Sequence, residues 1–139
     1  MDLNDFLGPN PIIVELKARD RWEAIDELMR SLVASNRIKP EDEAPITMAV
    51  KQRESSMTTG IGSGFGLPHA ETNLIYEVVS AVGRSRRGIQ FDAIDGKPVN
   101  LVFLFLVPEG EFQKHLHTLA NMAKLLHSSS FRDDLGLGS

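Results

Sequence analysis

Residues 99–107 read Val-Asn-Leu-Val-Phe-Leu-Phe-Leu-Val, and every residue from Leu101 to Val107 is apolar. A strand that is apolar on both of its sides is typical of the centre of a sheet whose two faces are covered. The run is too short to cross a bilayer, which requires a helix of about 20 apolar residues. The stretch therefore predicts a buried central strand in a sheet with helices on both faces.

Three segments have the pattern of helices. They are expected over residues 21–34, from Pro40 or Pro45 to Gln52, and over residues 114–127. Asp20 precedes the first helix as an N-cap, and Glu23 three residues later suggests a capping box. Asn36 suits the turn that ends this helix. Pro45 fits a first helical turn better than a helix interior, because its missing N–H is tolerated there.

Short β-rich runs flank the central strand. Further strands are expected at residues 12–16, 76–84 and 89–91. A glycine-rich turn within residues 54–68 should lead into a short strand that stops at Pro68, and Asp95-Gly96 marks another turn. The order β, α, α, β, β, β, α predicts an α/β fold.

Composition limits the class of protein. The chain has 139 residues, 42% of them hydrophobic, which fits one compact domain over residues 1–139. The net charge of -4 argues against electrostatic nucleic-acid binding, and the absence of cysteine excludes thiol catalysis, disulfides and cysteine-based zinc sites. No signal peptide is visible in the acidic N-terminal decapeptide. These features agree with a cytoplasmic protein that is not inserted in a membrane.

His69 has the most distinctive setting of the four histidines. It follows Pro68, which stiffens the backbone, and the alternating glycines 60, 62, 64 and 66. Ligands of α/β proteins usually bind at strand ends, and glycines there leave N–H groups free for an anion. The pattern fits a phosphoryl site. It fits equally well a tight turn in which His69 is incidental.

The other histidines lie in the last expected helix. Residues two apart on a helix point in directions about 200° apart, so His115 and His117 are not expected to share a metal. His115 begins the apolar stripe and should face inward, whereas His117 should face solvent and His127 is expected to be structural. The helix follows the central strand directly, which would bring His115 to the same sheet edge as His69. The spacing does not show that the two meet.

Arg53 is the last basic residue before the glycine-rich stretch. A guanidinium at this place can clamp a phosphate through paired hydrogen bonds. Charge patterning alone favours a simpler interpretation, in which Arg53 and Glu54 form a solvated helix end.

Three blocks of the sequence resemble one family. The first runs from Arg53-Glu54 through Thr58-Thr59-Gly60-Ile61-Gly62-Ser63-Gly64-Phe65-Gly66-Leu67-Pro68-His69-Ala70. The second is Gly88-Ile89-Gln90-Phe91-Asp92-Ala93-Ile94-Asp95-Gly96-Lys97-Pro98-Val99, and the third is His115-Leu116-His117-Thr118-Leu119-Ala120. Together they resemble enzyme IIA domains of the fructose, mannitol and nitrogen-regulatory type in the phosphoenolpyruvate-dependent phosphotransferase system (PTS). The likeness covers nearly the whole chain.

The resemblance implies a three-layer α/β/α fold with a mixed sheet and a role as a phosphotransferase component. His69 would accept phosphate, through Nε2, from the phosphohistidine of HPr or its nitrogen-branch counterpart, and would pass it to an enzyme IIB partner or a regulatory target. His115 would lie beside it and Arg53 near the phosphate. No cofactor and no metal are implied. Phe65, Leu67 and Ile61 are candidates for an apolar docking surface, or equally for the core.

The sequence departs from the family at two places. The family often has a basic residue shortly after the histidine, but here Glu71 follows Ala70, and a carboxylate pointing inward would repel a phosphohistidine. Family members usually continue into a further C-terminal helix, which this chain is expected to lack. The apolar surface thereby exposed would favour a homodimer.

Two other functions fit parts of the sequence. One is a regulatory or binding module that keeps the fold but transfers no phosphate. The other is a metal-dependent enzyme using His69 and His115, which is disfavoured because the chain has only four histidines and no cysteine. The sequence does not separate the sugar-transport branch from the nitrogen-regulatory branch, although residues 115–119 of the third block and 91–95 of the second lean slightly toward the latter.

Overall fold

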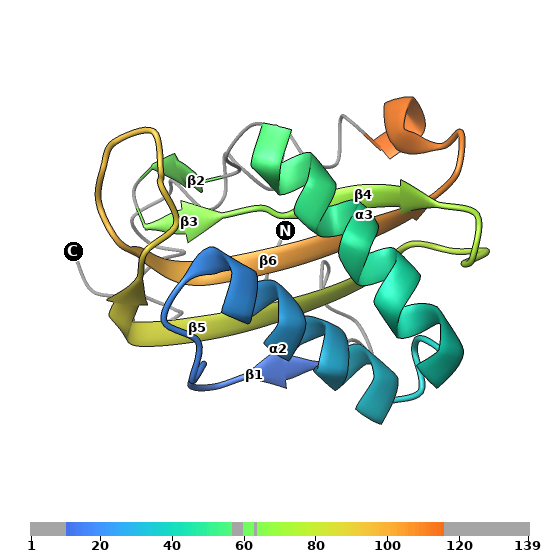
Figure 1. Ribbon diagram of the computed structural model, residues 1–139, viewed down its shortest axis with the longest axis horizontal. Coiled ribbons are helices and arrows are strands. Elements are labelled where there is room, and N and C mark those ends of the chain that lie inside the picture. The colour runs from blue at the N-terminus through green and yellow to red at the C-terminus, as the bar shows by residue number, and fades with distance from the viewer. Residues whose placement is uncertain (1–10, 57–59, 63, 116–139) are drawn as a thin grey trace.

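A mixed six-stranded sheet forms the centre of the structure, a computed structural model that describes residues 11–56, 60–62 and 64–115. Its strands are β1 (Ile12–Ile13), β2 (Gly60–Gly62), β3 (Phe65–Gly66), β4 (His69–Thr72), β5 (Val79–Ile89) and β6 (Val99–Pro108). The strand order is β1-β5-β6-β3-β2, and β4 also pairs with β6 (Figure 1). β5 and β6 are antiparallel, whereas β1 is parallel to β5, and β3 and β4 are parallel to β6. The predicted α/β class with a mixed sheet is confirmed.

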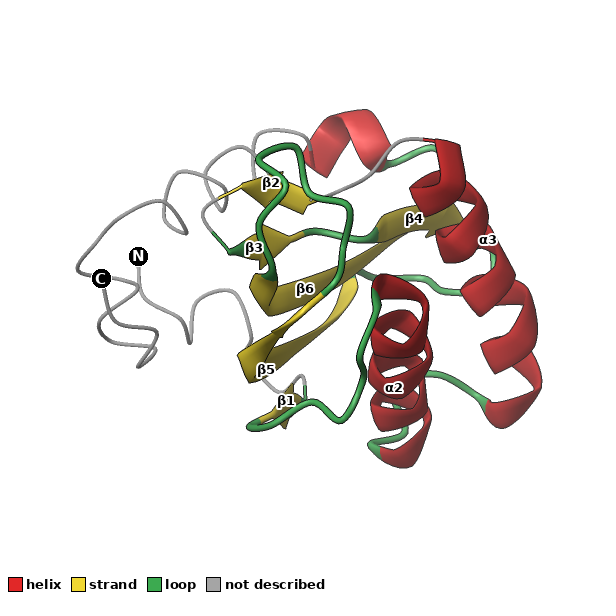
Figure 2. Ribbon diagram, turned by 60° about the vertical axis from the view of Figure 1, so that its left-hand side comes forward, coloured by secondary structure: helices red, strands yellow, loops and turns green. Residues whose placement is uncertain are grey.

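Two helices lie side by side on one face of the sheet. They are α2 (Arg21–Ala34) and α3 (Glu43–Ser56), and a short 3-10 helix (Pro40–Asp42) leads into α3. Figure 2 shows both on the same side of the strands. The third expected helix begins at Phe112, two residues earlier than predicted. It is described as far as residue 115, and the rest of the prediction, including His117 and His127, lies outside the described residues.

The ends of α2 follow from local chemistry. The Asp20 carboxylate accepts a hydrogen bond from the Glu23 N–H at 2.9 Å, so the predicted N-cap is confirmed. The Glu23 carboxylate accepts from the N–H of Arg19, one residue before the position that a capping box requires. Asn36 has a φ of 63°, and the N–H of Arg37 donates to the Leu32 carbonyl, as in a Schellman C-cap.

α3 places the residues that matter most for the site. Pro45 lies in its first turn, where the missing N–H has no helical partner to lose. The helix continues to Ser56, four residues beyond the predicted end at Gln52. Arg53 and Glu54 therefore belong to its last turn.

The core between the helices and the sheet is aliphatic. Its fully buried side chains come from α2, α3 and alternate positions of the two long strands. They include Ile25, Leu28, Met29, Leu32, Ile46, Val50, Ala81, Val102, Leu104 and Leu106. None of the helices in the described part of the chain is both long and apolar enough to span a membrane.

The strand after Pro68 was not predicted. The expected strand should have stopped at that proline, but pairing with β6 resumes at His69, because Phe105 N–H donates to the Pro68 carbonyl at 3.0 Å. A proline is tolerated here since β4 needs hydrogen bonds only on the side that faces β6. His69 is thus the first residue of β4, and it does not follow the end of a strand that stops at Pro68.

Two other strands differ from the predicted bounds. β5 joins the second half of one predicted strand to the start of the next, and Tyr76, which was expected inside it, is 97% exposed. β1 is limited to two residues instead of five. The predicted Asp95-Gly96 turn is confirmed, with the Gly96 N–H donating to the Ala93 carbonyl at 2.9 Å.

Candidate functional site

His69 lies half-buried on β4, on the face of the sheet opposite α2. Strand β4 pairs His69 with Phe105 and Ala70 with Leu106, and both Ala70 and Leu106 belong to the core beneath the helices. Successive side chains of a strand point to opposite faces, so His69 and Phe105 share the other face. The imidazole is partly open and is held on a paired strand.

One ring nitrogen of His69 is fixed by the backbone. Its Nδ1 lies 2.9 Å from the Leu67 carbonyl oxygen. A carbonyl can only accept, so in the neutral ring the proton sits on Nδ1 and the lone pair sits on Nε2. Leu67 is placed for this bond by Pro68, which keeps the preceding residue extended. The tautomer follows from this local geometry.

Phe112 connects His69 to Arg53. The rings of Phe112 and His69 are stacked, with centroids 5.3 Å apart and planes 13° from parallel. The Arg53 guanidinium carbon lies 5.5 Å from the centre of the same Phe112 ring, within the range of a cation–π contact. Arg53 is exposed at the end of α3. Its positive charge is close enough to the His69 ring to lower the pKa of the imidazole. Sequence reasoning missed Phe112, because the helix was expected to begin after it.

His115 packs against the residue that is paired with His69. The Phe105 and His115 rings meet edge to face, with centroids 6.3 Å apart. Nε2 of His115 lies 3.5 Å from Oε1 of Glu111 and has no hydrogen-bond partner within the described residues. The structure thus brings His115 to the His69 side of the sheet, as the chain order had suggested.

The electrostatic setting lowers the pKa of His69 below its ordinary value of 6.5. Burial of the ring is the main cause, and the positive charge of Arg53 acts in the same direction. The hydrogen bond with Leu67 and the Glu54 carboxylate oppose them. The net effect favours the neutral imidazole at neutral pH.

Glu54 is a buried part of the site that the sequence did not reveal. It was expected to lie on a solvated helix end, but it is 1% exposed. Nη1 of Arg21 lies 3.1 Å from its carboxylate, and Nη2 of Arg21 lies 3.5 Å from Asp92. A buried carboxylate requires such pairing because an isolated charge in the core is costly. This ion pair ties the start of α2 to the last turn of α3, next to Arg53.

Glu71 does not point its carboxylate into the site as an unpaired charge. Oε2 of Glu71 accepts a hydrogen bond from the Gly110 N–H at 2.8 Å. Of the three residues expected either on an apolar docking surface or in the core, Phe65 and Leu67 are buried, which decides for the core in both cases. The side chain of Ile61 lies outside the described residues.

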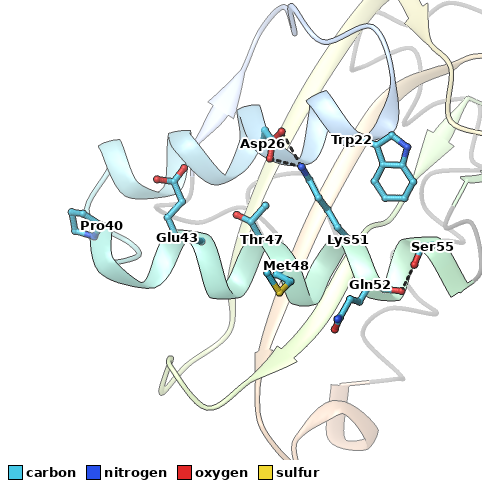
Figure 3. A pocket seen from close by; sticks show the side chains of 10 residues that line it. Trp22, Asp26, Pro40, Glu43, Thr47, Met48, Lys51, Gln52 and Ser55 are labelled. Carbon is cyan, nitrogen blue, oxygen red and sulfur yellow. Dashed lines mark hydrogen bonds and ion pairs between the residues drawn. The ribbon is translucent and has the colours of Figure 1, made fainter.

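A groove of about 730 Å³ lies elsewhere, between α2 and α3 (Figure 3). It is crossed by the ion pair of Lys51 with Asp26, whose nitrogen and oxygen are 2.9 Å apart. The groove contains no histidine, so its size does not make it the reactive centre. Within residues 11–56, 60–62 and 64–115, no three histidine or carboxylate side chains gather as a metal site would require.

The fold is shared with solved enzyme IIA proteins. The crystal structure of the nitrogen regulatory protein IIA-Ntr from Neisseria meningitidis matches with a TM-score of 0.83 at 27% identity, covering 98% of this chain and 90% of that one. A complex of enzyme IIAMTL with phosphorylated enzyme IIBMTL from Escherichia coli matches with a TM-score of 0.72 over 92% of this chain and 85% of that one. At 20% identity, it shows the fold alone.

The family follows from the sequence comparison. The sequence model of one protein family, described as phosphoenolpyruvate-dependent sugar phosphotransferase system, EIIA 2, matches residues 5–136 of this chain. The chain therefore belongs to this family. It is 35% identical to the PTS fructose-specific EIIA component of Haloferax volcanii, over 97% of this chain and 88% of that protein. It is 30% identical to the PTS fructose-specific EIIABC component of Bacillus subtilis, over 97% of this chain but only 21% of that protein's length.

Proposed function

We propose that this domain relays a phosphoryl group through Nε2 of His69. The donor would be the phosphohistidine of HPr or of its nitrogen-branch counterpart, and the acceptor an enzyme IIB protein or a regulatory target. The relay would take place in the cytoplasm. The observation that carries the proposal is the contact between Nδ1 of His69 and the Leu67 carbonyl, because it directs the remaining lone pair of a neutral ring away from its own strand.

The transfer needs a nucleophile and a place for negative charge. The lowered pKa of His69 keeps the imidazole neutral, so no separate base is required. As the N–P bond to the donor histidine breaks, a new N–P bond forms at Nε2. Negative charge is spread over the phosphoryl oxygens during this step, and catalysis depends on cations and donors placed around them. Arg53 and the Nε2 of His115 would serve in these roles.

Phosphorylation in a reconstituted system tests the proposal. The chain is incubated with phosphoenolpyruvate, enzyme I and each of the two carrier types, and its intact mass is measured. The wild type should gain one acid-labile phosphoryl group, and His69→Ala should gain none. His127→Ala provides the control, since that histidine is not a proposed acceptor. A wild-type chain that takes no phosphate from either carrier would contradict the proposal.

The likeness to the Neisseria IIA-Ntr protein favours a second use of the same site. Phosphorylation of His69 would then act as a signal that changes binding to a regulatory target. In a module that only binds, His69→Ala would leave partner binding unchanged. In a signalling relay, the phosphorylated and unphosphorylated forms would bind the target with different affinities.

A further inference from the structure

A carboxylate at position 71 is unexpected next to a phosphate acceptor, because it places a negative charge on the same strand face as His69. The two are separated by one residue on β4, and side chains two apart on a strand point to the same side. The Glu71 carboxylate nevertheless reaches past the end of the strand. Its Oε2 accepts the N–H of Gly110, with 2.8 Å between the oxygen and the nitrogen.

Gly110 belongs to a turn that leaves one N–H without an internal partner. The N–H of Glu111 donates to the Pro108 carbonyl at 3.1 Å, and Gly110 has a φ of 83°, as in a type II turn. The turn hydrogen bond uses the N–H of Glu111, so the N–H of Gly110 needs an acceptor from elsewhere. The charged oxygen of Glu71 supplies it, in a type of hydrogen bond stronger than a neutral one.

A second hydrogen bond holds the same turn on β4. The N–H of Glu109 donates to the Thr72 carbonyl at 2.9 Å, directly after the last paired residues of β4 and β6. The backbone therefore fixes one end of the turn, and the side chain of Glu71 fixes its tip. Two neighbouring residues of β4 thus determine where the chain goes after β6.

The turn leads directly into the helical residues that cover the site. Phe112, two residues after Gly110, stacks on His69, and His115 packs against Phe105. Because β4 carries both His69 and Glu71, the acceptor ring and the anchor of the segment above it belong to one short strand.

We propose that Glu71 is a positioning residue for the transfer to His69. It holds the Pro108–Glu111 turn so that Phe112 stays stacked on the imidazole and His115 stays against Phe105. This inference rests on the proposed function. In this role the carboxylate is bound to the turn and does not face the arriving phosphate.

Three variants test this role. Glu71→Ala removes the acceptor, whereas Glu71→Gln keeps an oxygen of the same reach without the charge. Glu109→Ala is the matched control, because it removes a carboxylate from the same turn but keeps the backbone bond to Thr72. Two quantities are measured, namely the nuclear Overhauser effects between the Phe112 and His69 rings in the unphosphorylated protein, and kcat and KM for transfer from the phosphorylated carrier.

Loss of the anchor should appear in both measurements. Glu71→Ala should lose the ring contacts and lower kcat by about 10- to 100-fold, as small misplacements of catalytic groups do. The KM for the carrier should change by less than about 2-fold, because the docking surface is intact. Glu71→Gln and Glu109→Ala should keep the ring contacts and stay within about 3-fold of the wild type in kcat.

Several results would overturn the proposal. Unchanged ring contacts in Glu71→Ala would show that the turn holds without its anchor. Faster transfer in Glu71→Gln and Glu71→Ala alike would show that charge repulsion outweighs positioning. A wild type that takes no phosphate would refute the proposed function instead, and the ring contacts would still decide whether Glu71 fixes the segment.

Discussion

The two faces of the sheet are built from different side chains. The face under α2 and α3 is covered by closely packed aliphatic residues, among them Leu28, Leu104 and Leu106. The opposite face, near β4, carries the rings of Phe105 and His69. Phe112 stacks on His69, and His115 meets Phe105 edge to face. The first face contains almost only apolar groups, whereas the second combines imidazoles with aromatic rings.

The face under the helices contributes mainly to stability, whereas the opposite face carries the side chains of the candidate site. Burial of aliphatic surface stabilises the domain in proportion to the area removed from water, and it requires dense packing. A reactive imidazole needs the reverse, namely partial access and nearby charges that set its pKa. Arg53 links the two faces. α3 packs on the first face, and Arg53 in its last turn contacts the Phe112 ring on the second.

The largest effect on stability is expected from the helix face. Leu104→Ala should lower the free energy of unfolding by about 2–5 kcal/mol, because it removes a fully buried side chain and leaves a cavity. Denaturant unfolding measures this change. His69→Ala is the comparison from the other face and should cost about 1 kcal/mol or less. Equal losses of unfolding free energy for the two variants would contradict the view that the helix-covered face contributes most of the stability.

The next effect concerns Arg53 and falls on transfer. Arg53→Ala should slow phosphoryl transfer to His69 by about 100-fold, as the loss of one charge-stabilising group does in other enzymes. The free energy of unfolding should change by only about 0.5 kcal/mol, because the side chain is exposed. Single-turnover transfer from the phosphorylated carrier gives the rate.

Arg30→Ala controls for the loss of a positive charge in general. Arg30 is an exposed arginine on α2, and its removal should leave the transfer rate within about 2-fold. If both variants were slowed equally, Arg53 would act by attracting the carrier from a distance and not at the phosphoryl group.

A smaller effect tests how tightly the helix face is packed. A Cβ added at Gly83 of β5 would lie 2.6 Å from Cδ2 of Leu16, closer than a real Cβ atom approaches another carbon. Gly83→Ala should therefore cost about 1–3 kcal/mol of stability, as overpacking does. The double variant with Leu16→Ala should be less destabilised than the sum of the two single variants, because the smaller side chain relieves the clash. Purely additive losses would contradict the packing described.

The smallest effect is the titration of His69. NMR should give a pKa below 6.5, with Nδ1 as the protonated nitrogen of the neutral ring. The unfolded state then binds more protons than the folded state between the folded pKa and 6.5. The contribution of His69 to stability is therefore present above pH 6.5 and is lost as the pH falls through the folded pKa.

Two variants should move this pKa in opposite directions. Arg53→Ala should raise the pKa of His69, because it removes a positive charge, and Glu54→Gln should lower it, because it removes a negative one. Shifts in the same direction for both would show that structural rearrangement dominates over charge.

Part of the site follows from local sequence, and part does not. The neighbourhood of Pro68 and the glycines singled out His69, and the family resemblance added Arg53 and His115, which the structure brings to the same region. Phe112 had no signal, since a phenylalanine just before an expected helix has no distinguishing pattern. The burial of Glu54 was also invisible, because Arg21, its partner, lies 33 residues earlier in the chain.

The sequence by itself determined the local features of this protein: the apolar run of β6, the cap of α2 at Asp20, the αL turn at Asn36 and the extended residue before Pro68. Each of these depends on neighbours within a few residues, so the chain alone contains the information. Only the tertiary structure decided that β4 resumes after Pro68, that Phe112 stacks on His69 and that Glu71 holds Gly110. These contacts join distant segments, and pairing with β6 creates them.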